Sequence, residues 1–191
     1  LFRYQKLSGR GIIFYFSLFF QLGEQPVCFG VLSRGIIGVA PDGEQKIQAT
    51  GCNYIILRTA WLYSEFGHNF VKTMKGLSDR VADPEDGLEQ VTVVDDQLGR
   101  LTFTRDMAEA IFHVLGTHAP YGTYDCTGSG AVKSWADIAR AVFEAANGNG
   151  DRVVPVSTAD YYASAAGPVA PRPVHSALDL SKLQSVGFHM P

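Results

Sequence analysis

The distribution of apolar and polar residues makes the chain regular from residue 43 onward. Tyr54–Arg58 and Val91–Val94 are apolar runs of strand length. Between them, residues 69–77 have the spacing of a helix, and residues 83–89 form an acidic stretch typical of a solvated loop. Because strands alternate with helices in this way, the pattern predicts an α/β fold with a largely parallel sheet.

Two longer helices are predicted further along. Thr104 stands where an N-cap would be, with Asp106 in the first turn to complement the positive helix end. Ser134 and Asp137 have the spacing of a capping box, and Gly148 follows as a helix stop. The expected apolar faces comprise Met107, Ala108, Ile111, Val114 and Leu115 in the first helix, and Ile138, Ala139, Val142, Phe143 and Ala146 in the second.

Shorter segments complete the pattern after these helices are placed. Gly122–Thr127 and Val153–Val156 are extended in character, whereas residues 163–173 are rich in Ala, Gly and Pro, which is typical of a loop. Leu180–Val186 has the length of a last helical turn or two. Each element supports the same α/β class.

The first 42 residues differ from the rest and contain six of the twelve Phe. Their uncharged run, residues 11–20, is about half of the ~20 residues that span a bilayer. Basic residues precede the run as in a signal peptide, but residues 21–26 do not form a cleavage site of small residues. A targeting segment, a buried strand or helix, and sequence foreign to the following domain are the open interpretations, and we favour the last.

Composition limits the function. The 191 residues are 46% hydrophobic and 18% charged with a net charge of -3, which fits a globular protein of one domain or one and a half. The charge balance argues against nucleic acid as the main partner, and no segment argues for a membrane. The three cysteines have no C-x-x-C spacing and the histidines no ligand spacing, so we expect buried thiols in a reducing cytoplasm and no metal site.

Four motifs follow one another in a specific order. They are RTAWLY at residues 58–63, NFVKTM at residues 69–74, VVDDQLG at residues 93–99 and RPVHSALD at residues 172–179. In this order they resemble the dTDP-4-dehydrorhamnose reductases, which are extended short-chain dehydrogenases/reductases. The resemblance covers residues 43–191, the latter half of such an enzyme.

The resemblance implies a partial Rossmann-like parallel sheet plus a smaller substrate-binding α/β subdomain. Residues 1–42 then form an atypical aromatic-rich segment outside the family, and residues 43–191 form the C-terminal half with the substrate-binding part. The implied reaction is reduction of the C4 ketone of dTDP-4-dehydro-L-rhamnose to dTDP-L-rhamnose, with NADPH or NADH, for cell-surface polysaccharide. A cytoplasmic location is expected from the cysteines, and a homodimer is an open expectation.

The resemblance also implies binding roles for particular residues. It places Trp61 against the sugar and Asn69 in a hydrogen bond to the substrate. Arg100 and Arg172 are candidates for binding the diphosphate or nucleotide, because a guanidinium matches phosphate oxygens. Each has a structural alternative: a core Trp covering the end of the sheet, an N-cap Asn, and surface arginines. Thr59 and Ala60 would lie near the nicotinamide and bind the cofactor mainly through their backbone.

The catalytic pair of this superfamily is missing. In the family a Tyr protonates the carbonyl oxygen, and a Lys four residues later holds the cofactor ribose and lowers the pKa of the Tyr. Aligning Gly43 and Glu44 with the family's Gly-Glu places Ile36 at the Tyr position and Ala40 at the Lys position, and the sequence has no other Y-x-x-x-K. Neither side chain can transfer a proton, so we expect the chain as written to be inactive.

The abrupt start of the resemblance suggests that residues before 43 are not the natural upstream sequence and that the chain, which begins at Leu1 and ends at Pro191, is a fragment. An out-of-frame or misassembled reading would explain this. Sequencing the encoding DNA upstream of Gly43 tests the hypothesis. An unbroken frame that encodes Ile36 and Ala40 would contradict it.

A second function stays open because the catalytic pair is absent. The same fold serves non-catalytic binding or regulatory proteins, such as the reductase-like regulatory subunit of methionine adenosyltransferase, and fold alone cannot separate the two. The motifs at residues 58–63 and 172–179 favour the reductase as the activity of the parent protein.

Overall fold

The structure is a computed structural model that describes residues 16–22, 25–33, 40–167 and 169–191. Ile36 therefore lies outside the described residues, and Ala40 is the first residue of a helix. The strands are β1 (Phe16–Leu22), β2 (Gln25–Ser33), β3 (Asn53–Thr59), β4 (Leu62–Tyr63), β5 (Val91–Val94), β6 (Leu98–Gly99), β7 (Thr102–Phe103), β8 (Gly122–Asp125), β9 (Lys133–Ser134) and β10 (Val153–Val156). The helices are α1 (Ala40–Ala49), α2 (Phe70–Ala82), α3 (Thr104–Gly116), α4 (Trp135–Asn147), the 3-10 turn η1 (Gly150–Arg152), α5 (Thr158–Tyr161) and α6 (Ser181–Ser185).

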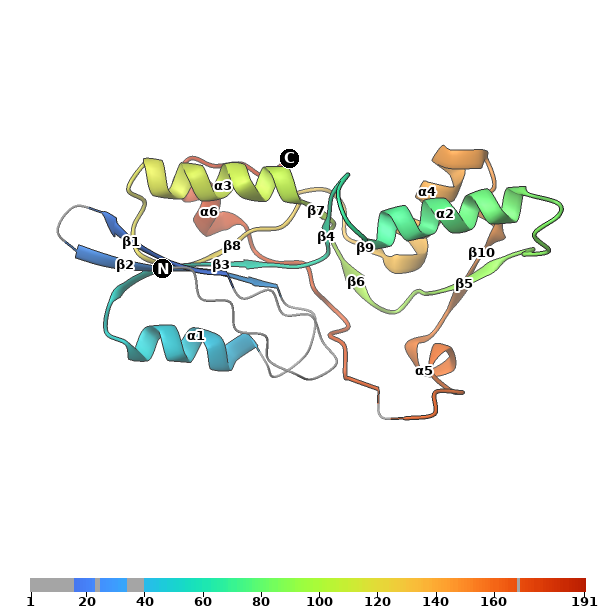
Figure 1. The fold of residues 1–191 in the computed structure, drawn as a ribbon, viewed down its shortest axis with the longest axis horizontal. Coiled ribbons are helices and arrows are strands. Elements are labelled where there is room, and N and C mark those ends of the chain that lie inside the picture. The colour runs from blue at the N-terminus through green and yellow to red at the C-terminus, as the bar shows by residue number, and fades with distance from the viewer. Residues whose placement is uncertain (1–15, 23–24, 34–39, 168) are drawn as a thin grey trace.

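A four-stranded sheet of order β1-β2-β3-β8 forms one lobe of the molecule. Strands β2, β3 and β8 are parallel, and β1 joins β2 as an antiparallel edge strand. Helix α1 covers one face of the sheet, whereas α3 and α6 cover the other (Figure 1). This arrangement confirms the predicted α/β class with a parallel sheet, and helices on both faces explain why β3 is a continuous apolar run.

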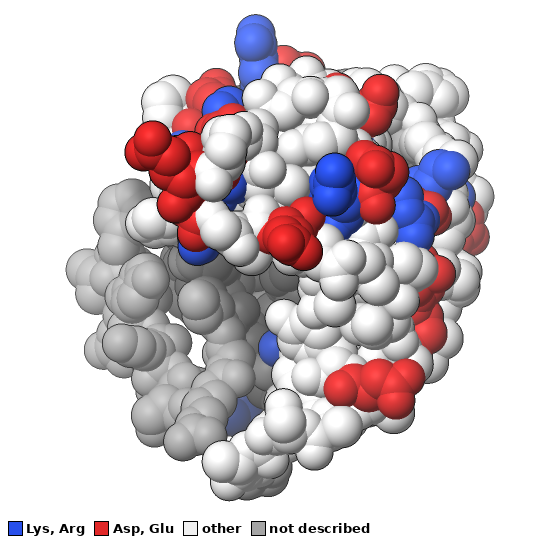
Figure 2. Space-filling view, turned by 90° about the vertical axis from the view of Figure 1, so that its right-hand side faces the viewer, with Lys and Arg blue, Asp and Glu red and all other residues white. Residues whose placement is uncertain are grey.

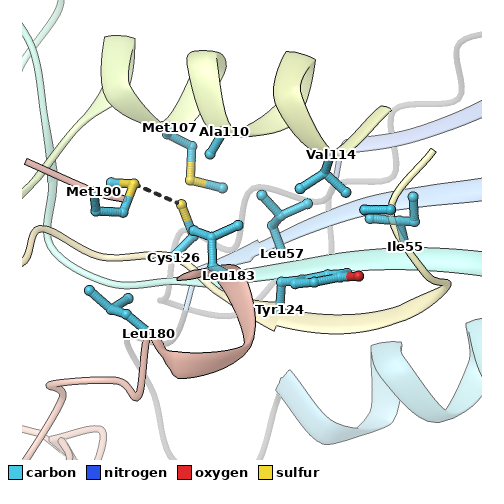
Figure 3. Close-up of a cluster of buried hydrophobic side chains, with 11 residues drawn as sticks. Ile55, Leu57, Met107, Ala110, Val114, Tyr124, Cys126, Leu180, Leu183 and Met190 are labelled. Atoms are coloured by element: carbon cyan, nitrogen blue, oxygen red, sulfur yellow. Dashed lines mark hydrogen bonds between the residues drawn. The ribbon is translucent and has the colours of Figure 1, made fainter. Parts of the chain in front are cut away.

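The core of this lobe lies between β3 and β8 on one side and α3 and α6 on the other (Figure 3). Leu57 and Tyr124 from the sheet are fully buried, as is Val114 from α3. Leu183 of α6 and Met190 close the same cluster, so the C-terminal segment completes the core. The carbonyl of Pro191 accepts a hydrogen bond from the Ser129 amide at 2.8 Å, which holds the chain end against the loop after β8.

The other lobe is a small α/β unit that contains α2, α4 and the parallel pair β10-β5 (Figure 1). Its core consists of Met74, Val93, Ala136, Ala139, Phe143 and Val153. Figure 2 shows that Lys and Arg are interspersed with Asp and Glu over this side of the molecule. Several are paired, including Lys75 with Asp79 at 2.7 Å and Arg80 with Asp86 at 3.0 Å.

Helix capping follows the sequence in one helix and departs from it in another. The α4 capping box is confirmed, since the Ser134 hydroxyl accepts from the Asp137 amide at 3.0 Å, and Gly148 ends the helix in the left-handed region with φ 64°. The prediction of Thr104 as an N-cap is wrong: Phe103 is the N-cap residue, and no side chain caps α3. Strand β7 pairs with β4 through Phe103, so a long-range contact sets the last extended residue.

The cysteines are in two different states. Cys126 is a free, fully buried thiol 3.5 Å from the Met190 sulfur. Burial, with smaller contributions from Asp106 and Asp125, raises the pKa of Cys126 to about 12, so the reactive thiolate is suppressed. Cys52 is disulfide-bonded, so the expectation of three reduced thiols is wrong at this position. Cysteine spacing alone does not show which residues the sheet brings together.

Two searches of the described residues were negative. They include no cluster of three or more His, Cys, Asp or Glu side chains arranged to hold a metal ion. None of the helices in the described ranges combines the length and apolarity that a membrane crossing requires.

The core packing predicts very unequal effects for two substitutions on α3. Met107 is 5% exposed, so Met107→Ala should lower the free energy of unfolding by about 2 to 5 kcal/mol through lost contacts and a cavity. Phe112, on the same helix, is 75% exposed, so Phe112→Ala should change it by less than about 0.5 kcal/mol. Urea unfolding of the two variants measures the difference, and equal effects would contradict this core.

Candidate functional site

The site begins at the carboxyl end of β3, the edge where open α/β sheets bind ligands. Thr59 and Ala60 lie there and are fully buried. The Thr59 hydroxyl and the Thr127 hydroxyl, which follows the neighbouring strand β8, are both buried, and neither has a hydrogen-bond partner in the part of the chain that the structure describes. Buried polar groups without partners are uncommon, so this edge of the sheet offers hydrogen-bonding capacity to a ligand.

The chain turns sharply as it leaves β3. Trp61 has a positive φ of 51°, a conformation that costs a residue other than Gly or Asn about 1 to 3 kcal/mol. Thr102 stabilises the turn twice, because its hydroxyl donates to the Ala60 carbonyl at 2.8 Å and its amide donates to the Trp61 carbonyl at 3.0 Å. The turn thereby directs the Trp61 side chain toward the second lobe.

The indole of Trp61 lies between two neighbours from distant parts of the chain. On one side it stacks on Trp135, the first residue of α4, with ring centroids 3.8 Å apart and planes inclined by 20°. On the other side lies Gly99: a Cβ placed there would be 2.8 to 3.0 Å from Cδ2, Cε2 and Cζ2 of Trp61. Near-equal distances to three ring atoms place Gly99 over a ring face, and stacked rings leave no room for backbone between them.

Asn69 is the N-cap of α2, so the structural alternative proposed for it is confirmed. Its Oδ1 accepts from the Lys72 amide at 3.1 Å, and its Nδ2 donates to the Ser64 carbonyl at 2.7 Å. The next residue, Phe70, contacts the Trp135 ring with centroids 4.4 Å apart. The start of α2 therefore lies beside the pair of tryptophans.

Arg100 joins three segments of the site. Its Nε donates to the Gly130 carbonyl at 2.7 Å, and its Nη1 donates to the Leu178 carbonyl at 3.3 Å. Nearby, Leu98 exchanges backbone hydrogen bonds of 2.7 Å with Val174 and Ser176. The motif that begins at Arg172 is thus held beside residues 98–100, although about seventy residues separate them.

Arg172 lines a cavity of about 550 Å³ whose walls come mainly from the loop between α5 and α6. The other lining residues are Tyr162, Ala165, Ala166, Gly167, Val169 and Ala170. Asp96 holds the start of α5, the helix that precedes this loop, because it accepts from the Thr158 amide at 2.9 Å and from the Thr158 hydroxyl at 2.5 Å. These hydrogen bonds lower the pKa of Asp96, which therefore keeps its charge.

A partly buried ion pair anchors α1 to the same strand. Glu44 of α1 is 5% exposed and accepts from Arg58 Nε at 2.7 Å and from Arg58 Nη2 at 2.5 Å. The hydrogen bond from Arg58 to Glu44 is the main cause of a raised pKa of Arg58. A bidentate pair fixes both position and orientation, so it sets where α1 begins relative to the end of β3.

The structure thus gathers motifs that the sequence identified separately. Trp61 is one ring of the aromatic pair, and Asn69 and Arg100 each stand next in sequence to a residue that contacts it, Phe70 and Gly99. Arg100 donates to Leu178 in the motif that begins at Arg172. Sequence reasoning missed Trp135 and Gly99. The available signal was that Trp135 is the other of only two tryptophans in the chain and opens a well-capped helix.

Comparison with known proteins agrees with this arrangement. The sequence profile of the RmlD substrate binding domain family matches residues 40–191. The chain belongs to this family. It is 37% identical over 153 residues to the dTDP-4-dehydrorhamnose reductase of Aggregatibacter actinomycetemcomitans, covering 75% of this chain and 48% of the relative. It is 34% identical over 146 residues to the spore coat polysaccharide biosynthesis protein SpsK of Bacillus subtilis, covering 76% of this chain and 46% of the relative.

The RmlD substrate binding fold is also found among solved structures. The dTDP-4-dehydrorhamnose reductase of Bacillus anthracis, crystallised with NADP, matches with a TM-score of 0.64 and 34% identity, over 79% of this chain and 48% of that one. The chain therefore spans about half the length of the relatives that it matches. The family match, residues 40–191, includes the aromatic pair, Arg100 and the Arg172 motif.

The packing of Gly99 against Trp61 predicts a stability difference between two glycine substitutions. Gly99→Ala should lower the free energy of unfolding by about 1 to 3 kcal/mol, because the new methyl overlaps an indole that Trp135 prevents from shifting. The matched control, Gly76→Ala in α2, meets no atom within 4 Å and should raise it by about 0.5 to 1 kcal/mol. Urea unfolding measures both, and a neutral Gly99→Ala would contradict the packing.

Proposed function

We propose that the parent protein reduces the C4 ketone of dTDP-4-dehydro-L-rhamnose to dTDP-L-rhamnose with NADPH or NADH, in the cytoplasm, and that this chain supplies its substrate side. The observation that carries the proposal is the match of residues 40–191 to the RmlD substrate binding domain, together with 37% identity to a dTDP-4-dehydrorhamnose reductase. The geometry supports it because Trp61, Phe70 and Gly99, one residue from each of the first three motifs, lie at the aromatic pair, and the Arg172 motif is hydrogen-bonded to residues 98–100.

The substrate is proposed to lie across these groups. Trp61 contacts the sugar, and Asn69, at the positive end of α2, donates to the substrate through the second hydrogen of its amide. Arg172 binds the diphosphate or nucleotide from the wall of the cavity. Arg100 contributes through Nη2, the guanidinium nitrogen that makes no hydrogen bond to the described residues.

The cofactor is proposed to bind at the carboxyl end of β3. When bound, it supplies the hydride for the carbonyl carbon. Thr59 and Ala60 fit the nicotinamide end, because a buried hydroxyl without a partner and a backbone turn lie together there. The ribose end does not fit, since Ala40, at the Lys position and the start of α1, has no charge or donor to offer. The ion pair between Glu44 and Arg58 still holds α1 against β3.

Reduction of the ketone also requires a proton for the oxygen. In the family a Tyr provides it, and this chain has Ile36 at that position and Ala40 at the Lys position. A general acid of this kind contributes about 10²- to 10⁴-fold to a rate, so the binding groups alone do not sustain turnover. The chain as written is therefore proposed to bind a dTDP-sugar without reducing it.

The same two positions favour one alternative, a non-catalytic binding or regulatory protein on this fold. In that case the site described above binds a nucleotide sugar or another protein, and the natural protein never had the Tyr and Lys. A homodimer is compatible with either function.

An assay of NADPH oxidation with dTDP-4-dehydro-L-rhamnose separates these functions. The chain alone should show no turnover, whereas a version in which residues 43–191 follow the upstream half of a dTDP-4-dehydrorhamnose reductase should turn over. A third protein, with Phe in place of the catalytic Tyr in that upstream half, is the matched control and should be inactive.

Two outcomes count against the proposal in different ways. Turnover by the chain alone would show that Ile36 and Ala40 do not stand at catalytic positions. A restored version that folds and binds dTDP but gives no turnover would favour the binding protein.

A further inference from the structure

The two faces of the Trp61 indole are both occupied within the protein. Trp135 covers one face at 3.8 Å, and Gly99 lies against the other at a distance that leaves no space for a methyl group. A sugar ring therefore has no free indole face on which to stack. Trp61 is only partly buried, so the ring edge is what remains accessible to a ligand.

The edge of Trp61 carries a polar group. Its Nε1–H makes no hydrogen bond to any described residue, and it is not among the buried polar atoms that lack a partner. Indole nitrogen is a donor only, and a donor at a half-buried edge is suited to a ligand oxygen. A hydroxyl or ring oxygen of a sugar is such an acceptor.

Trp135 is itself held firmly. It is the first residue of α4, directly after the capping box, and the Ser134 hydroxyl donates to Asp95 at 2.5 Å. Phe70 also packs against the Trp135 ring, with ring centroids 4.4 Å apart. A group with locked neighbours can fix the orientation of the residue that it contacts, which is the requirement for a preorganised binding site.

We propose that Trp135 and Gly99 are positioning residues that clamp Trp61, so that Trp61 recognises the sugar through its edge and Nε1–H and not by stacking. The proposal rests on the function proposed above for its ligand, the sugar of a dTDP-sugar, but the clamp itself does not. It explains why Trp61 adopts a strained backbone: the left-handed turn is what places the ring between the two partners.

The clamp has a spectroscopic signature that needs no ligand. The chain has only two tryptophans, and stacked indoles couple their electronic transitions, so the circular dichroism of the native 191-residue chain should show an exciton couplet. Trp135→Leu should abolish the couplet, and Phe112→Leu, an exposed control on α3, should keep it. A native chain without a couplet would overturn the clamp.

Binding separates edge recognition from stacking. Isothermal titration of the same proteins uses dTDP-L-rhamnose as the probe and dTDP, which lacks the sugar, as the reference. Trp61→Phe removes the N–H but keeps an aromatic face, and we expect it to weaken dTDP-L-rhamnose binding about fivefold to tenfold, the value of one hydrogen bond, with dTDP unchanged. Trp135→Leu should weaken it similarly, and Trp135→Phe, which keeps a flat ring in the clamp, should retain most of the affinity.

The opposite results are equally definite. If Trp61 stacks on the sugar, Trp61→Phe binds almost normally and Trp135→Leu binds as well as or better than the parent chain, because a face has been freed; this would overturn the inference alone. If the native chain binds dTDP-L-rhamnose no more tightly than it binds dTDP, the sugar part of the proposal is wrong. If it binds neither, the proposed function fails, and the couplet still decides whether the clamp exists. A folded variant that is less stable in urea but keeps the native ratio of dTDP-L-rhamnose affinity to dTDP affinity serves as a further control. It shows that a loss of stability does not by itself weaken sugar binding.

Discussion

The site depends on how the chain leaves strand β3 at Trp61. The strand delivers Thr59 and Ala60 to the edge of the sheet, and the left-handed turn at the next residue redirects the chain toward the second lobe. Two hydrogen bonds from Thr102, made to consecutive carbonyls, offset part of the cost of that backbone conformation. Because β7 continues from Thr102 directly into α3, the turn, the sheet and the helix that covers it form one unit.

Charge plays a complementary role on the other face of the sheet. Glu44 and Arg58 form a bidentate pair that fixes α1 on β3. A buried ion pair is weak evidence for stability, because desolvation opposes it, but it specifies orientation well. The pair therefore sets the orientation of α1 relative to the strand that leads to Thr59 and Ala60.

The local signals in the sequence were sufficient where short-range physics decides the structure. The apolar run at β3, the capping box of α4 and the left-handed Gly148 all appear as predicted, because each depends on residues within a few positions. Thr104 failed as an N-cap because pairing of β4 with β7 determines where the extended backbone ends. The prediction of Cys52 as a reduced thiol failed because disulfide formation depends on the tertiary structure, which cysteine spacing does not record.

The sequence by itself determined the α/β class, the longer helices α2, α3 and α4, the strands β3, β5, β8 and β10, and, through four ordered motifs, the family. It also showed that Ile36 and Ala40 cannot do acid–base chemistry, since this follows from side-chain composition alone. Only the tertiary structure decided that Trp135 and Gly99 enclose Trp61. It also decided that two nitrogens of Arg100 donate to the carbonyls of Gly130 and Leu178, so that the Arg172 motif lies beside Arg100. These contacts join residues tens of positions apart, and their geometry arises only when the two lobes pack. The local periodicity of the sequence therefore cannot predict them.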